Sequence, residues 1–326
     1  MHQLSDLHEN AEIFKETKDK RFHLPSPQEK VRVNILALGD VGGALLTGLV
    51  LVGGEVVKSI GIFDVNESNA QRYEAEMNQI TYPLESGMFP ATMAIYDENE
   101  LFDCDVFLFC ASKAVPALNS GVSDVRMAQY GENKKIVEHY ARLAGEKSFN
   151  GIFAVVSDPV DPLCKAAFKA SGLHPGRFRG FGLGVMNGRA MYYAKKEKKF
   201  GHYITEGRAF GPHGQDLVIA DSVHDYNDEL SRELTQKVVT ENIRIRNMGF
   251  KPFMAPAFSS GALSVLAMLK GHWHYSSNYI GSGWDGAFFG ALNKVVDGKT
   301  EMENLPLCGK LFERIRAAYE NLRNID

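Results

Sequence analysis

The chain has 326 residues, of which 44% are hydrophobic, and a formal net charge of −4 at pH 7. This length can bury two modest hydrophobic cores, so we expect two domains. The slightly acidic balance gives no electrostatic reason to expect nucleic acid or an anionic membrane as a partner, and no apolar run reaches the roughly 18 residues of a membrane span. The four cysteines are scattered without Cys-x-x-Cys spacing, which favours reduced thiols in a cytoplasmic protein and indicates neither zinc nor disulfides.

The first 30 residues mix five basic with six acidic side chains and contain no apolar segment typical of a signal peptide. We expect residues 1–30 to form an arm that packs on the rest of the chain or on a neighbouring subunit.

A glycine-rich turn follows the first apolar stretch, Val31–Leu38, and opens a segment with helical character. Glycines permit a tight turn and let backbone N–H groups approach a phosphate, while the helix N-terminus adds partial positive charge. The turn follows the pattern Gly-x-Gly-x-x-Gly, except that Ala37 stands in the first glycine position. We therefore predict a dinucleotide-binding turn, with these candidate cofactor residues: Gly39, Asp40, Val41 and Gly42.

A second apolar strand, Ser59–Asp64, ends in a carboxylate. Asp64 stands where a carboxylate accepts hydrogen bonds from a ribose 2′-hydroxyl, and this favours NAD over the phosphorylated cofactor. The alternative is a strand–turn–helix unit that binds no ligand.

Two further apolar strands are predicted over Asp105–Ala111 and Gly151–Ser157, and helical periodicity lies over 66–79 and 133–146. Short buried strands alternating with helices are typical of an α/β fold with a doubly wound parallel sheet. We place this domain over 31–176.

An α+β domain is predicted over 177–326, where glycine, tyrosine and histidine become frequent. Its predicted elements include a strand over 201–205 and a helix over 226–248. A last helix is expected near the chain end, where four apolar residues share one face: Leu311, Ile315, Tyr319 and Leu322.

Several motifs follow one another in a fixed order: Val125-Arg126 with Asn133 seven residues later, Ser157-Asp-Pro-Val-Asp161, Gly182–Ala190 and Gly211-Pro-His-Gly-Gln215. In this order and spacing the chain resembles the NAD-dependent lactate/malate dehydrogenase family, from about Val31 to the last helix. The resemblance implies a Rossmann domain followed by a catalytic domain, and hydride transfer between NAD(H) and an L-2-hydroxy or 2-oxo acid. It also implies a homodimer or homotetramer, and it adds Ala111, Asn133 and Ser157 to the candidate cofactor residues.

Three residues match the catalytic positions of that family. His213 would be the acid/base, because a group that titrates near neutrality must exchange a proton with the substrate oxygen. Arg126 would polarise the substrate carbonyl, and Arg189 would hold the substrate carboxylate. A turn histidine and two structural arginines are the alternatives.

The chain departs from the family at two positions close to this chemistry. The family's aspartate that orients the catalytic histidine either corresponds to Asn187 or is absent. It stands three residues before the family's arginine, whereas Asn187 precedes Arg189 by two, so either one residue is deleted here or Ala190 takes the arginine's place. The family's Ser-Asn-Pro-Val-Asp segment has Asp158 in place of its asparagine. We therefore hypothesise that Asp158 has become the anionic partner of His213. The alternative is that Asp158 only caps a turn before Pro159.

The expected substrate is a 2-oxo monocarboxylate. The malate branch carries a second loop arginine where this chain has Ser120, and the whole loop 113–124 contains no arginine. Burying a second carboxylate without a cation would be costly, so a dicarboxylate is disfavoured. The apolar stretch Val115–Leu118 favours a larger, apolar side chain.

Two other functions remain open on the sequence. Asn187 and the uncertain register of Arg189 would suit an NAD-binding relative that has lost catalysis. An NAD-dependent glycosidase would need a metal and Cys/His ligands, and Cys164 is the only cysteine shortly after the Asp158–Asp161 segment.

Overall fold

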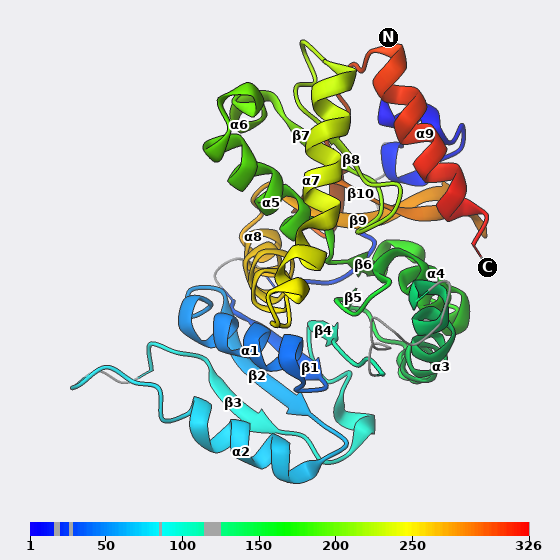
Figure 1. Ribbon diagram of the computed structural model, residues 1–326. Coiled ribbons are helices and arrows are strands. Elements are labelled where there is room, and N and C mark those ends of the chain that lie inside the picture. Colours follow the sequence, from blue (N-terminus) through cyan, green and yellow to red (C-terminus); the bar gives the residue numbers. More distant parts are fainter. Residues whose placement is uncertain (16–19, 26–28, 85–86, 114–124, 326) are drawn as a thin grey trace.

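The computed structural model describes residues 1–15, 20–25, 29–84, 87–113 and 125–325. Within these ranges a sheet of nine strands runs through the molecule in the order β11-β10-β9-β6-β5-β4-β1-β2-β3 (Figure 1). The strands of its first part are β1 (Val31–Leu36), β2 (Val57–Phe63), β3 (Ala91–Ala94), β4 (Val106–Phe109), β5 (Ile152–Val155) and β6 (Phe178–Gly180).

These six strands pair in parallel and have the order 3-2-1-4-5-6, which is the arrangement of a doubly wound dinucleotide-binding sheet. The helices of this part are α1 (Asp40–Val52), α2 (Glu67–Met77), α3 (Val125–Glu146) and α4 (Val160–Ser171). The strand order reverses between β1 and β4, so the crevice at their carboxyl ends is the expected ligand site. The predicted fold class is confirmed.

The predicted domain boundary near residue 176 stays a prediction. β6 continues the parallel sheet to Gly180 and pairs there with Ser277 of β9, so the two halves of the chain share one sheet. β3 was not predicted, because its four residues carry little apolar signal.

The second half contributes helices and an antiparallel extension of the sheet. The helices are α5 (Leu183–Lys196), α6 (Tyr203–Glu206), α7 (Asp228–Asn247), the π-helix Pro256–Ala262, α8 (Leu263–Leu269) and α9 (Gly309–Arg323). The strands are β7 (Arg208–Phe210), β8 (Val218–Ala220), β9 (His274–Ser282), β10 (Asp285–Val296) and β11 (Lys299–Met302). Short 3₁₀ turns cover Leu4–Leu7, Glu12–Phe14, Glu98–Glu100, Pro175–Arg177 and Lys198–Phe200.

Two of the predicted helices are confirmed here and one predicted strand is wrong. α7 and α9 lie where expected, and α9 buries all four residues of its predicted apolar face. The predicted strand over 201–205 is instead a turn at 201–202, directly after the 3₁₀ helix Lys198–Phe200, and the start of the short helix α6. Tyr203 lies on this helix and is buried. The alternating pattern that predicted a strand therefore reflects the buried face of a short helix.

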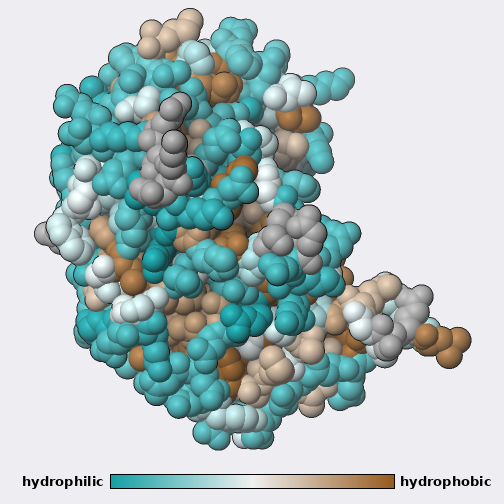
Figure 2. Space-filling model, turned by 180° about the vertical axis from the view of Figure 1, so that it is seen from behind, coloured by the Kyte–Doolittle hydropathy of each residue, from teal (hydrophilic) through white to brown (hydrophobic). Residues whose placement is uncertain are grey.

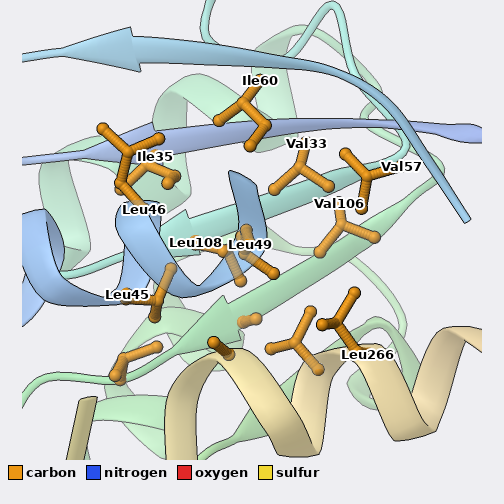
Figure 3. Close-up of a cluster of buried hydrophobic side chains, with 14 of the residues drawn as sticks. Val33, Ile35, Leu45, Leu46, Leu49, Val57, Ile60, Val106, Leu108 and Leu266 are labelled. Carbon is orange, nitrogen blue, oxygen red and sulfur yellow. The ribbon is translucent and has the colours of Figure 1, made fainter. Parts of the chain in front are cut away.

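The core that positions the cofactor-binding turn lies between the sheet and the helices α1 and α8 (Figure 3). Leu45, Leu46 and Leu49 of α1 are fully buried among β-branched residues of the strands. Each such side chain contributes about 1.5–3 kcal/mol by its burial. α1 also approaches the π-helix closely, because a side chain on Gly48 would overlap Phe258 and Ala262. The first helix of the nucleotide domain is thus fixed against the second half of the chain.

The N-terminal arm packs on its own chain. Leu4, Leu7 and Ala11 are buried in the cluster around α9, and His2 pairs with Leu307 in a β-bridge. Another segment projects instead: the connection between α2 and β3 extends from the body in Figure 1 and, seen from behind, in Figure 2, and Leu84 on it is fully exposed.

Candidate active site

The turn after β1 has a conformation that explains its glycines. Ala37 adopts φ +72, in the left-handed region that the family's glycine would occupy without steric cost. A Cβ on Gly42 would overlap the carbonyl oxygen of Ala37, so the first turn of α1 packs directly on the backbone of the loop. Gly42 is therefore required by the protein's own close packing.

Gly39 is a glycine for a different reason. It is the N-cap of α1, its φ is −71, and a Cβ built on it meets no protein atom within 4 Å. Neither backbone strain nor packing demands a glycine there. Open space at the N-terminus of a helix suits the close approach of a pyrophosphate, whose charge the helix dipole favours. The residues present therefore fit a dinucleotide.

The next two residues of the turn differ in their surroundings. Val41 packs against the core cluster of the nucleotide domain, so its backbone N–H is the group that can serve a cofactor. Asp40 is half exposed, and its carboxylate pairs with Lys251 at 2.8 Å. An exposed pair of this kind contributes at most about 1 kcal/mol. The pair does neutralise the Asp40 carboxylate, whose charge would otherwise repel the phosphates of a bound dinucleotide.

Asp64 follows β2 and contacts the same turn. Its Oδ2 accepts a hydrogen bond from the backbone N–H of Leu38 at 2.8 Å, and its Oδ1 accepts one from that of Asn66 at 2.9 Å. Asn69 donates to Oδ2 at 3.2 Å. The carboxylate is thus fixed beside the glycine-rich turn, where it was predicted to meet the ribose.

The other predicted cofactor residues lie at the carboxyl ends of β4 and β5. Ala111 is half-buried after β4, and Ser157 is buried after β5. Asn133 is fully buried. Its amide group donates to the carbonyl of Asp158 at 2.8 Å and accepts from the backbone N–H of Lys113 at 2.9 Å. Asn133 thus holds the backbone of Asp158, and the cofactor contact predicted for it stays a prediction.

His213 and Asp158 meet across the two halves of the chain. Nδ1 of His213 lies 2.8 Å from Oδ1 of Asp158. The histidine side chain is 13% exposed and the aspartate side chain 51% exposed. Asp158 leads by a cis peptide bond into Pro159 and α4, whereas His213 lies on the loop between β7 and β8. With Nδ1 held by a carboxylate, Nε2 is the nitrogen available to a substrate.

The loop around His213 is built from glycines in unusual conformations. Gly211 has φ +94 and Gly214 has φ +149. The N–H of Gly211 bonds to the carbonyl of Gly290 at 2.9 Å, which ties the loop to β10. A Cβ on Gly182 would lie 2.7 Å from the Cβ of His213, so this glycine makes room for the histidine. The Gly-Pro-His-Gly motif is therefore a specific backbone path rather than a surface turn.

Asn187 has a partner of its own. Its Oδ1 accepts a hydrogen bond from the hydroxyl of Tyr203 at 2.9 Å, and Tyr203 is fully buried. Asn187, one of the alternatives for the family's aspartate position, thus bonds within the second half of the chain, and the carboxylate on His213 comes from Asp158.

Arg189 lies on α5 and is partly buried against α7. Nη1 donates to the carbonyl of Val238 at 3.2 Å. Burial lowers the pKa of Arg189, and the carboxylates of Glu241 and then Asp158 act in the opposite direction. Asp158 therefore interacts electrostatically with Arg189 as well as directly with His213.

Two predictions concern residues outside the described parts of the structure. The backbone of Arg126 lies in the first turn of α3, but its side chain is not among those described. Ser120 and the apolar stretch Val115–Leu118 also lie outside the described ranges.

Ser260 and Asp161 complete the surroundings of His213. The hydroxyl of Ser260 donates to the carbonyl of Gly182 at 2.7 Å and accepts from the N–H of Val185 at 2.8 Å, so it fixes the start of α5. Asp161 is buried, and its Oδ2 accepts the backbone N–H of His213 at 3.3 Å. The sequence analysis named Asp161 only as the last residue of a motif and gave it no role. An acidic residue at the start of an otherwise apolar helix was the feature that could have indicated one.

Among the described residues, no three His, Cys, Asp or Glu side chains are grouped as metal ligands. The same ranges contain no helix that is both long and apolar enough to cross a membrane.

Residues 31–180 match the family model described as lactate/malate dehydrogenase, NAD binding domain. Over these residues the chain is similar to the NAD-binding domain of lactate/malate dehydrogenases. The expected resemblance and the predicted cofactor, NAD, are both confirmed.

Individual relatives agree with the family match at low identity. The chain is 23% identical over 192 residues to an L-lactate dehydrogenase of Mesomycoplasma hyopneumoniae (strain 232), a match that covers 59% of this chain and 58% of that protein. It is 26% identical over 199 residues to an L-lactate dehydrogenase of Treponema denticola, which covers 60% of this chain and 59% of the relative. The chain thus spans less than two thirds of the length of these curated relatives.

Solved structures share the fold over most of the chain. A minor L-lactate dehydrogenase from Enterococcus mundtii superposes with a TM-score of 0.73 at 18% identity, covering 91% of this chain and 97% of that one. The malate dehydrogenase from Picrophilus torridus gives a TM-score of 0.71, also at 18% identity, and covers 91% and 96%. The second half of the chain therefore has the fold that accompanies such NAD-binding domains.

Proposed function

We propose that this protein is an NAD-dependent dehydrogenase that interconverts a 2-hydroxy and a 2-oxo monocarboxylic acid, with L-stereochemistry. The observation that carries the proposal is the 2.8 Å contact between His213 and Asp158, at the end of the NAD-binding domain. A largely buried histidine with a carboxylate on one nitrogen is the arrangement required of an acid/base that must change its charge during turnover.

Bound NAD supplies or accepts the hydride. In reduction, His213 gives a proton from Nε2 to the substrate oxygen on which negative charge develops. Asp158 keeps the ring in one orientation through Nδ1 and offsets the imidazolium charge. In oxidation, the neutral ring takes the proton from the hydroxyl group.

Arg189 is proposed to hold the substrate carboxylate. Both of its hydrogen bonds within the described residues use Nη1. Nη2 and Nε remain for an incoming carboxylate, which a guanidinium binds in a bidentate manner. Asn187 lies two residues before Arg189 on the same helix, and the buried Tyr203 holds its side chain in place. Arg126 is proposed to polarise the carbonyl, and the absence of arginine from loop 113–124 supports a monocarboxylate.

The test is NADH oxidation against pyruvate, 2-oxoisocaproate, phenylpyruvate and oxaloacetate, with the His213→Ala variant measured beside the wild type. We expect turnover with a monocarboxylate and its loss in the variant, while NADH binding by fluorescence is retained. Preference for oxaloacetate would contradict the monocarboxylate assignment.

An NAD-binding relative without catalysis is the second candidate. The observation that favours it is the bond from Tyr203 to Asn187, which occupies the position of the family's orienting aspartate. NADH binding without turnover on any of these acids would select this candidate.

The predicted homodimer or homotetramer and the cytoplasmic location stay predictions. Light scattering of the purified protein would test the first.

A further inference from the structure

Asp161 lies beneath the His213 loop and contacts its backbone. It is the second residue of α4, and its side chain is buried with the residue only 3% exposed. Oδ2 accepts the backbone N–H of His213 at 3.3 Å, and Oδ1 accepts the hydroxyl of Ser277 on β9. One carboxylate thus joins the start of α4, the central sheet and the loop that carries the histidine.

Two glycines allow Asp161 to contact both the His213 loop and β9. A Cβ on Gly180 would overlap Val160 and approach the Cβ of Ser277 to 3.0 Å. A Cβ on Gly182 would press on the Cβ of His213. Glycines at both ends of this short segment therefore allow Asp161 to reach its two partners.

Burial of Asp161 destabilises its ionised form. Burial raises the pKa of Asp161 to about 6, although the bonds from Ser277 and from the His213 N–H act in the opposite direction. Within this balance the charge of His213 lowers the pKa of Asp161 and, to a smaller extent, the charge of Asp158 raises it. Cys164 lies on the same helix. Burial, and then the charge of Asp161, raises the pKa of its thiol. A neutral residue would avoid this desolvation, so a structural role alone does not account for the acid.

We propose that Asp161 is a positioning residue of the reaction, whose ionised carboxylate fixes the backbone of His213 while Asp158 fixes the ring. The inference rests on the proposed function for its kinetic consequence. Residues 158 and 161 belong to the same turn into α4, so they hold the histidine at two points from one rigid element. Small losses of alignment at such a group reduce turnover strongly.

Protonation of Asp161 removes one of its acceptor sites and weakens this hold. In the reduction direction the acid form of His213 is the active one, so acidification by itself does not disable the proton donor. A fall in kcat below about pH 6 that is lost in Asp161→Asn therefore reports Asp161, consistent with its raised pKa.

The kinetic test uses Asp161→Asn and, as a graded variant, Ser277→Ala. We expect Asp161→Asn to lower kcat about tenfold or more at pH 8, which is the size of effect found for groups that orient a catalytic or metal-binding side chain. The fall in kcat below about pH 6, the acid limb of the pH profile, should disappear in this variant. The dissociation constant for NADH should be unchanged. Ser277→Ala removes a bond that lowers the pKa of Asp161, so the acid limb should move to higher pH.

A second measurement does not depend on turnover. In the His213→Ala variant the ring is gone but the backbone N–H at 213 remains, so its ¹⁵N amide resonance should still titrate with Asp161, near pH 6 or slightly above. The inflection should vanish in His213→Ala/Asp161→Asn. Wild-type protein with no turnover but with this inflection would overturn the proposed function and keep the contact. Full kcat in Asp161→Asn, or no inflection at 213, would overturn the inference on Asp161.

Discussion

Oδ1 of Asp158 lies 2.8 Å from Nδ1 of His213, although the two residues are separated by 55 positions in the chain. The aspartate comes from the end of the parallel sheet and the histidine from a loop of the second half. Their contact therefore forms only when the two halves are assembled.

The Asp158→Asn variant tests the role proposed for this contact. The loss of charge leaves the imidazolium unsupported and permits the wrong tautomer, which lowers kcat by up to about 10⁴ in an analogous hydrolase. We expect a decrease of at least about 10² in kcat, with NADH binding retained. Steady-state kinetics and a fluorescence titration measure the two quantities, and unchanged kcat would remove Asp158 from the mechanism.

The double variant Asp158→Asn/Asn187→Asp separates the two candidate partners of His213. The side chain at 187 bonds to Tyr203 at 2.9 Å, so an aspartate there should not restore activity. Turnover of the double variant should stay at the level of Asp158→Asn. Recovery to within a few-fold of wild type would show that position 187 can reach the histidine.

Gly39→Ala and Gly42→Ala form a matched pair in the cofactor-binding turn. A methyl group on Gly39 meets no protein atom, so stability should be unchanged, whereas NADH affinity should fall about tenfold or more because the methyl occupies the pyrophosphate space. A methyl group on Gly42 overlaps the carbonyl of Ala37 and should lower the free energy of unfolding by roughly 1–3 kcal/mol. Urea denaturation and NADH titration distinguish them; equal NADH affinity in Gly39→Ala would contradict the assigned pyrophosphate position.

Ala37→Gly should stabilise the protein. Ala37 has φ +72, and the left-handed conformation costs a residue with a Cβ roughly 1–2 kcal/mol, partly offset by the greater freedom of glycine in the unfolded chain. We expect a net gain of about 0.5–1 kcal/mol in the free energy of unfolding. It should appear as a higher urea midpoint with an unchanged m-value, and a lower midpoint would contradict the strain at Ala37.

His274 makes stability fall on acidification. Burial, followed by the charge of Arg179, lowers its pKa from 6.5 to about 3. Above pH 6.5 the ring is neutral in both folded and unfolded states, and its contribution is constant. Between pH 6.5 and 3 the unfolded state binds the proton preferentially, so the free energy of unfolding declines, by at most about 1.4 kcal/mol per pH unit.

The control for this slope is His274→Asn, which can keep the donor to the carbonyl of His272. Its free energy of unfolding should depend less on pH over the same window. Because the carboxylates titrate in both proteins, the difference between the two curves isolates His274. Parallel curves would mean that His274 has the same pKa in the folded and unfolded states, which would contradict the lowered pKa.

Local patterns were sufficient for the nucleotide half of the molecule. Val31–Leu38 and Ser59–Asp64 predicted β1 and β2 because a buried parallel strand is apolar on both faces, and the glycines after β1 predicted the turn. The four-residue strand β3 and the three-residue strand β6 were missed because such short segments depend on their neighbours in the sheet. Tyr203 misled the prediction in the second half, where its burial comes from a short helix.

The sequence by itself determined the class of domain, the cofactor and the identity of the acid/base candidate, since each depends on residue types at short spacing. It also showed that an aspartate and an asparagine stand in exchanged positions. Only the tertiary structure decided which of them meets His213, because that choice depends on where the turn into α4 faces the loop after β7. It likewise placed Asp161 under the histidine, a contact between residues 52 positions apart that no local pattern encodes.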